Sequence, residues 1–326
     1  MRSEVSGIAG RTRWMWVLVL LGWAPGAAAQ PSPEIPWTVQ HQQAVRATLR
    51  DYDARLRADY AERLQRWRRG FVERRQAAVE EAGRELAELA AAIRDRREVS
   101  WKAVGEDPQF ERRAGELAGG LIDPAAVRGE LGEWARAVEQ QTRREMLRCF
   151  RQIIASDLGL HFDQKLRGKV EAAVRAIPIE RLVAAEATRE QLTAAIIGGL
   201  PGVVLTDAQK RRIAVAAGEL ARRGAHWLAV AELQLPPDWA EMLAGLAGRL
   251  AAKVSARALE SIDRWLTGEP QPEAIAGALR RALGDWNQRR LQPKLDAILR
   301  AYRYRVLEFV EREAERSAQH VLEGPR

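Results

Sequence analysis

The sequence has 326 residues, 52 lysines and arginines against 44 acidic residues, and a net charge of +8. Its length allows one to three domains with a sizeable core, and its 47% hydrophobic content excludes a wholly disordered chain. The single cysteine excludes a disulfide framework within the chain, and the four histidines leave little material for a histidine-rich metal site.

The first 29 residues have the three-part layout of a secretory signal peptide. Three arginines (Arg2, Arg11, Arg13) precede an apolar stretch at 14–23, and small residues follow it. Because a bilayer span needs roughly twenty apolar residues, we expect cleavage before Gln30, with an uncleaved anchor as the alternative. The sequence thus predicts an exported protein without a permanent transmembrane segment, periplasmic or extracellular, in a bacterial envelope.

Export changes what the charge implies. Cleavage leaves 49 basic and 43 acidic residues, a net charge of +6. A pI near 10.1 would otherwise favour nucleic-acid binding. Because we expect the chain to be exported, nucleic acid is not a favoured partner.

Prolines divide the rest of the chain into stretches rich in Ala, Leu, Arg and Glu, which are strong helix formers. No stretch shows a sustained alternation of β-branched residues, so we expect an all-α fold. Residues 30–37, with three prolines, are expected to form an extended leader. The expected helices span 38–98, 107–118, 124–156, 163–177, 179–187, 189–198, 207–223, 238–267, 272–288 and 294–322.

Several expected helix starts carry capping residues. Asp123 precedes a proline, which predicts an N-cap, and the capping-box spacing occurs in Thr188–Gln191 and Thr206–Gln209. The segment Leu205–Gln209 (Leu-Thr-Asp-Ala-Gln) also resembles the L-T-x-x-Q element of small exported helical stress proteins and chaperones of the Spy type. That family folds as a helical, cradle-like dimer and repeats the element, whereas it occurs once here. The resemblance is consistent with a helical envelope protein.

The first expected helix carries an apolar stripe whose residues recur at steps of about 3.7 residues. This spacing predicts a straight or faintly right-handed amphipathic helix. Arg75 occupies the one stripe position that lacks an apolar side chain. The stripe consists of Val45, Leu49, Tyr52, Leu56, Tyr60, Leu64, Trp67, Phe71, Ala78, Ala82, Leu86, Leu89 and Ile93.

The stripe is longer than its most obvious cover, the helix at 124–156. The helices at 107–118 and 294–322 are candidates for the remainder, and otherwise a second chain or a ligand must cover it. We therefore expect dimerisation or binding of a protein partner along Leu49, Tyr52, Leu56, Tyr60, Leu64, Trp67 and Phe71. The expected organisation is a long amphipathic N-terminal helix in an extended helical hairpin at 38–156, followed by a compact multi-helix bundle at 157–326.

An arginine-rich run overlaps the stripe. Between residues 63 and 75 the only acid is Glu73, so the local charge is +5, and two stripe aromatics interleave with the basic residues. One interpretation is a clamp for anionic envelope components such as lipid head groups or acidic polymers. The other, which the periodicity favours, is a solvated helix face. The arginines are Arg63, Arg66, Arg68, Arg69, Arg74 and Arg75.

The chemistry-bearing residues do not form a recognisable catalytic pattern. Cys149 has no activating base at a known spacing, so we expect a buried, inert thiol, with cross-linking of two chains as the alternative. His161 and Asp163 could share a local site, but a loop hydrogen bond is the favoured interpretation. No metal or cofactor motif occurs. The remaining candidates are scattered or solvated: His41, His226, His320, Glu80, Glu81, Glu85 and Glu88.

These observations lead to three hypotheses of function. The first is an exported, non-enzymatic helical protein that binds a protein partner or client in the cell envelope, as an adaptor, scaffold or chaperone. The second is a binder of anionic envelope components through the arginine-rich helix. The third is an all-helical enzyme of unrecognised type.

Overall fold

The computed structural model describes residues 37–183, 188–229 and 271–323, and every regular element within these ranges is a helix. The predicted all-α fold is confirmed. The expected signal segment, nearly all of the leader and the helix expected at 238–267 lie outside the described residues. The helices are α1 (Trp37–Glu73), α2 (Gln76–Arg97), α3 (Trp101–Gly105), α4 (Pro108–Gly120), α5 (Pro124–Leu160), α6 (Gln164–Arg175), α7 (Ile179–Val183), α8 (Arg189–Gly198), α9 (Asp207–Ala229), α11 (Pro272–Trp286), the π-helix η2 (Asn287–Leu291) and α12 (Gln292–Glu323).

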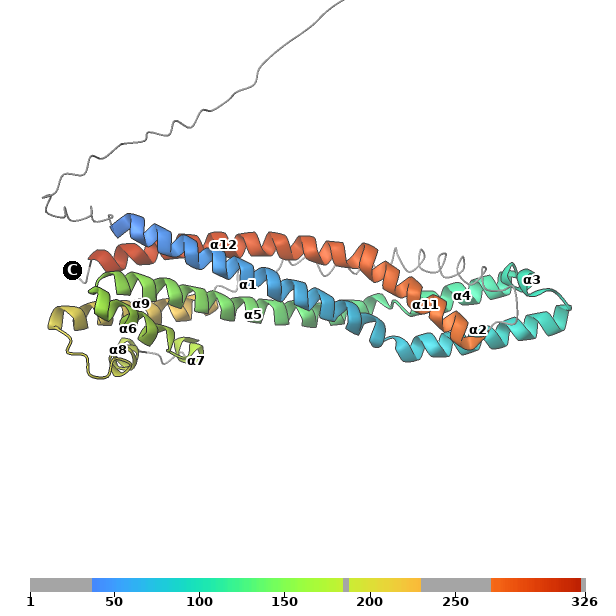
Figure 1. The fold of residues 1–326 in the computed structure, drawn as a ribbon. Coiled ribbons are helices and arrows are strands. Elements are labelled where there is room, and N and C mark those ends of the chain that lie inside the picture. The colour runs from blue at the N-terminus through green and yellow to red at the C-terminus, as the bar shows by residue number, and fades with distance from the viewer. Residues whose placement is uncertain (1–36, 184–187, 230–270, 324–326) are drawn as a thin grey trace, which may run out of the picture. The chain divides into compact units, whose positions relative to one another are not determined.

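The long helix expected at 38–98 is bent where α1 meets α2 (Figure 1). The backbone N–H of Arg75 donates to the carbonyl of Val72 at 3.1 Å, which interrupts the regular i to i−4 pattern. The Arg75 side chain then supplies the missing donor, because its Nη1 donates to the carbonyl of Phe71 at 3.0 Å. Its Nε donates to the carbonyl of Leu121 at 2.9 Å. The one polar position of the stripe therefore satisfies the backbone that the bend leaves open.

The same chain covers the stripe of α1. Figure 1 shows α1 running beside α5 and α12, and α1 also contacts α11. Tyr52 and Phe71 are fully buried, and Trp67 is 5% exposed. From the sequence, we expected the C-terminal helix to cover at most part of the stripe. In the structure this helix, α12, packs along α1 together with α5. The apolar face that we expected a partner to cover is thus part of the core of the chain.

A single π-helical turn, η2, joins α11 to α12 and keeps their buried faces aligned. Buried apolar residues recur every three or four positions on both sides of the turn, but Trp286 and Leu291 are five positions apart, with the buried polar Asn287 next to Trp286. A π turn holds one residue more than an α turn, so the buried face stays on one side. Within η2, Asn287 Nδ2 donates to the carbonyl of Arg68 at 3.2 Å, which fastens the turn to α1 close to the bend.

The predicted helix caps are confirmed. Asp123 accepts hydrogen bonds from the N–H groups of Ala125 and Ala126 at the start of α5. Both reciprocal bonds of the capping box form in Thr188–Gln191 and in Thr206–Gln209. The Leu-Thr-Asp-Ala-Gln segment therefore has a local structural role as the start of α9.

Beyond α5, shorter helices pack against its C-terminal half. α5 continues unbroken to Leu160, past the boundary expected at 156, and both α6 and α9 contact it. The described helices on the two sides of this boundary belong to one compact unit. The division into a hairpin at 38–156 and a bundle at 157–326 therefore stays a prediction. The contacts give no reason to place a boundary at residue 156.

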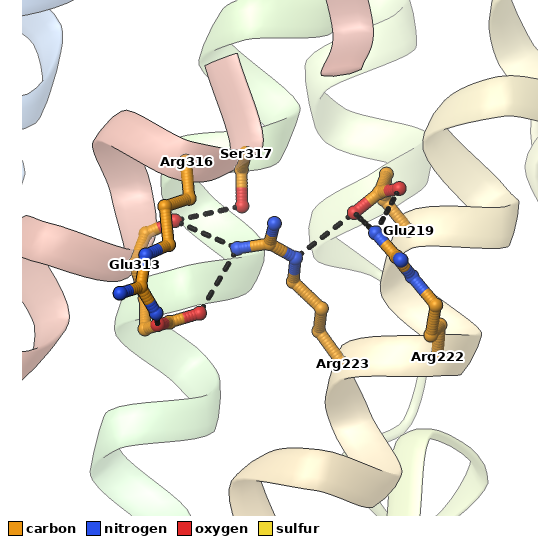
Figure 2. A network of polar contacts seen from close by, with 6 residues as sticks. All are labelled: Glu219, Arg222, Arg223, Glu313, Arg316 and Ser317. Atoms are coloured by element: carbon orange, nitrogen blue, oxygen red, sulfur yellow. Dashed lines mark hydrogen bonds and ion pairs between the residues drawn. The ribbon is translucent and has the colours of Figure 1, made fainter. Parts of the chain in front are cut away.

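A buried ion network ties α9 to α12 (Figure 2). Arg223 lies between two carboxylates, with Nε 2.9 Å from Glu219 and Nη1 3.0 Å from Glu313. Its Nη1 also donates to the backbone carbonyl of Glu313 at 2.9 Å. Arg222 and Arg316 pair with the same two carboxylates from the exposed side. Because every charge has partners, the burial of this network is tolerated.

Candidate ligand-binding sites

Three of the six predicted anion-contact arginines gather around one recess between α1 and α5. This arginine–tryptophan recess has a volume of about 300 Å³. Trp67 and Trp134 form its apolar part, with ring centroids 6.3 Å apart. The indole N–H of Trp67 is buried and has no hydrogen-bond partner among the described residues. The charged lining residues are Arg63, Arg66, Arg74, Glu130 and Glu133.

A glycine in the last turn of α1, Gly70, leaves room for Arg74 to reach this recess. A Cβ placed on Gly70 would lie 2.7 Å from Arg74 Nη1, the flexible end of that side chain, so a larger residue at position 70 would make the guanidinium shift slightly. Arg74 lies over the Trp67 ring, with Cζ 5.2 Å from the ring centroid. Glycine inside a helix costs about 0.5–1 kcal/mol relative to alanine, so alanine at position 70 would favour the helix while it moves the Arg74 guanidinium.

The arginines of the recess already have acidic partners. Arg63 contacts Asp59 at 2.8 Å, and Arg74 contacts Glu130 at 2.8 Å. Arg66 contacts Glu62 at 2.6 Å, and this hydrogen bond lowers the pKa of the Glu62 carboxyl. The Arg66 and Arg74 side chains are 59% and 45% exposed. Exposed pairs of this kind contribute about 0–1 kcal/mol, so a ligand anion can compete for these guanidinium groups.

The other three arginines of the predicted cluster lie elsewhere. Arg68 donates to Gln288 at 2.8 Å, and Arg69 is exposed on the same helix. Arg75 is only 7% exposed, and its guanidinium bonds to two backbone carbonyls and to Glu130. The sequence could not separate these groups, because it does not show where α1 bends or what faces each side of it.

The residues of the predicted partner-binding stripe lie inside the chain. The members that are buried are Tyr52, Leu56, Tyr60, Trp67 and Phe71. Leu49 and Leu64 are partly buried and pack against the same core. Polar bonds reinforce this packing, since the Tyr60 hydroxyl lies 2.8 Å from Thr142 Oγ1 on α5. Binding through this stripe would require α1 to separate from its neighbours.

A second site, missed in the sequence, lies where α1 begins and α5 ends. His41 Nδ1 lies 2.5 Å from Asp157 Oδ1, and both residues are buried. Burial raises the pKa of the Asp157 carboxyl, and the hydrogen bond with His41 opposes that effect. Trp37 stacks on the His41 ring at 5.1 Å, and His161 stacks on Trp37 at 6.1 Å. Burial lowers the pKa of His161.

This second cluster opens into a pocket of about 360 Å³ between α1 and α12, which we call the amino-terminal pocket. Trp37 and His41 line the pocket, and four buried polar atoms of the cluster have no hydrogen-bond partner in the described part of the chain. These atoms are Trp37 Nε1, His41 Nε2, Asp157 Oδ2 and His161 Nε2. His41 and Asp157 are 116 positions apart, so only the antiparallel packing of α1 on α5 joins them.

The remaining sequence candidates are structural. Cys149 is a free thiol, fully buried, and burial raises its pKa to about 12, which fits the expected inert thiol. Asp163 caps α6 by accepting hydrogen bonds from the N–H groups of Lys165 and Leu166, so it does not form a site with His161. Within residues 37–183, 188–229 and 271–323 no group of three potential ligands could hold a metal ion.

Comparison with protein-family models, with curated proteins and with solved structures found no match. No helix in the described ranges is both long and apolar enough to cross a membrane.

Proposed function

We propose that this chain is an exported binding protein rather than a catalyst, and that the arginine–tryptophan recess takes an anionic group of an envelope component. The observation that carries the proposal is the convergence of Arg63, Arg66 and Arg74 on one recess beside Trp67. The anion chemistry is that of a lipid head group or of an acidic polymer.

The physical basis is the match between guanidinium groups and oxyanions. Arginine presents planar donors that hold carboxylate or phosphate oxygens through two parallel hydrogen bonds. The recess also supplies an apolar wall of two indoles, against which the uncharged part of a ligand can pack. A ligand with more than one negative charge can replace the exposed Glu62 partner of Arg66 at small cost and can share the half-exposed Arg74 with Glu130.

Binding of a protein client along the α1 stripe is less well supported by the packing. The apolar side chains that such a client would contact already bury themselves against α5 and α12. The recess, in contrast, is open and charged without any rearrangement of helices. We therefore assign the binding role to the recess and not to the stripe.

A co-sedimentation assay tests the proposal. Vesicles of phosphatidylcholine with roughly 30–50% of the anionic lipid phosphatidylglycerol are compared with vesicles of phosphatidylcholine alone. Anionic lipid at such levels attracts basic protein surfaces. We expect binding only with the anionic lipid, and weaker binding as salt rises from about 50 to about 300 mM. A soluble acidic polymer, poly-glutamate, serves as a competitor; displacement by it assigns binding to charge rather than to the lipid itself.

A matched pair of double variants locates the site. R66Q with R74Q removes two charges from the recess, and R68Q with R69Q removes two charges from the same helix outside it. We expect the first pair to weaken binding by about tenfold or more and the second by about threefold or less, since each direct charge-assisted contact contributes about 1.5 kcal/mol or more. Equal effects of the two pairs, or salt-insensitive binding, would contradict the proposal.

The single substitution Gly70→Ala gives a test with opposite signs. It should raise helix stability by about 0.5–1 kcal/mol, because alanine is the better helix former. It should also weaken anion binding, because the new Cβ displaces the Arg74 guanidinium from its place over Trp67. A variant that is more stable and binds as tightly as the parent protein would show that binding does not depend on the place of this guanidinium over Trp67.

A further inference from the structure

The amino-terminal pocket differs in charge from the arginine–tryptophan recess. Its α12 wall carries two carboxylates, Glu311 and Glu315, which are exposed and one helical turn apart. The arginines that alternate with them pair elsewhere, Arg312 with Glu308 and Arg316 with Glu313. Among the described residues no ion pair reaches either of the two pocket carboxylates.

The α1 wall of the pocket contributes a further acceptor. An ionised Asp157 can only accept a hydrogen bond, which places a proton on Nδ1 of His41, and in the neutral form of that imidazole Nε2 keeps a free lone pair. The His41 side chain is 7% exposed, and its Nε2 lacks a partner in the described structure. A buried acceptor without a donor is costly, which is a reason to expect a donor from a ligand.

The aromatic lining of the pocket also favours a cation. Trp37, the first residue of α1, is half-buried and lines the pocket while it stacks on the His41 ring at 5.1 Å. Indole faces attract cations through the ring quadrupole. The opposing group is Arg46, which also lines the pocket, so the fixed charges of its lining are two negative and one positive.

We propose that the amino-terminal pocket is a binding site for an organic ammonium group, held between the two carboxylates of α12 and the Trp37–His41 pair of α1. The three N–H donors of a primary ammonium match the acceptors Glu311, Glu315 and His41 Nε2. His41 Nε2 is buried, so we expect the neighbouring indole ring of Trp37 to move as the ammonium reaches it. The ammonium group can belong to a free amine or to a lysine side chain.

Calorimetric titration with n-butylammonium tests the site, and 1-butanol is the neutral probe of similar size. We expect the ammonium to bind with a Kd of about 1 mM and the alcohol to show no measurable binding. N-acetyl-lysine methylamide separates the two sources: binding of this probe points to a lysine side chain, and its failure while butylammonium binds points to a free amine. Binding of both butyl probes alike, or of neither up to roughly 20 mM, overturns the proposal.

Charge variants on exposed positions sharpen the test without threatening the fold. E311Q with E315Q should weaken butylammonium binding roughly fivefold, whereas E308Q, on the same helix outside the pocket, should leave it unchanged. R46Q should tighten binding roughly twofold, because it removes a like charge from the pocket. The side-chain indole N–H resonance of Trp37, assigned with W37F, should shift on titration. Unchanged affinity in E311Q with E315Q, or a motionless Trp37 signal, would show that the ammonium binds elsewhere.

Discussion

Replacing Arg75 by leucine separates two explanations of how α1 and α2 are joined. From the sequence, Arg75 is the one gap in an apolar stripe, so a leucine should complete the stripe and stabilise a continuous helix. In the structure, its guanidinium holds the carbonyls of Phe71 and Leu121 and pairs with Glu130. The two views predict opposite signs for the change in the free energy of unfolding.

The magnitude follows from the lost contacts. Two backbone carbonyls left without a donor cost about 2 kcal/mol each, and the partly exposed pair with Glu130 adds about 1 kcal/mol. Burial of the leucine side chain returns about 2 kcal/mol. We therefore expect R75L to lower the free energy of unfolding by about 3 kcal/mol.

Urea unfolding followed by circular dichroism measures this change. The control is R69L, an exposed position on the same helix, for which we expect a change within about 0.5 kcal/mol. Hydrogen exchange of the amides around the bend should become faster in R75L than in the control. Equal or greater stability of R75L would refute the argument, because it would mean that the helix can straighten and bond its own backbone.

Three further predictions use the same unfolding assay. Gly83→Ala should destabilise the protein by about 1–3 kcal/mol, because its Cβ would lie 2.7 Å from a backbone oxygen of α11, while Gly129→Ala, with open space around it, should stabilise it by about 0.5–1 kcal/mol; a gain at both sites would contradict the close helix packing. Burial raises the pKa of Tyr302 from 10.0 to about 12, so its contribution is complete below pH 10 and is lost as the pH rises towards 12, and Y302F should flatten the fall in stability over that window; an unchanged slope would count against it. R223M should cost about 2–4 kcal/mol because it removes the buried partner of two carboxylates that then keep only the exposed Arg222 and Arg316, whereas R222M, with a side chain 60% exposed, should cost at most about 1 kcal/mol; similar losses would mean that burial does not set the energetics.

Local chemistry made the fold class and the helix starts readable from the sequence. The capping pairs Thr188–Gln191 and Thr206–Gln209 bond their own neighbours, so spacing alone predicts them. The stripe of α1 was also readable, since its buried members repeat at helical spacing. The helices that cover the stripe could not be predicted in the same way. Which helices cover it depends on how α5 and α12 fold back onto α1, and the periodicity of one helix carries no information on such long-range contacts.

The candidate sites divide in the same way. The arginine-rich run was visible as composition, yet the recess selects only Arg63, Arg66 and Arg74 from it. At the bend next to Arg74 and the buried Arg75, the Arg75 side chain bonds a backbone carbonyl in place of its own N–H, which no stripe pattern reveals. The His41–Asp157 pair was invisible, because each residue alone is an ordinary polar position in a helix.

The π turn between α11 and α12 also determines where the chain can lose a residue without disturbing the core. In an α-helix each residue turns the chain by about 100°, so five residues carry a side chain about 140° out of phase and four carry it only about 40°. Deleting one exposed residue of the turn, such as Arg289, would therefore let a regular α-helix run through while the buried faces of both helices stay aligned. A deletion of the same size elsewhere in α12 would rotate all the following core residues out of the interior. The π turn is thus a position at which this long helical run tolerates the loss of a single residue.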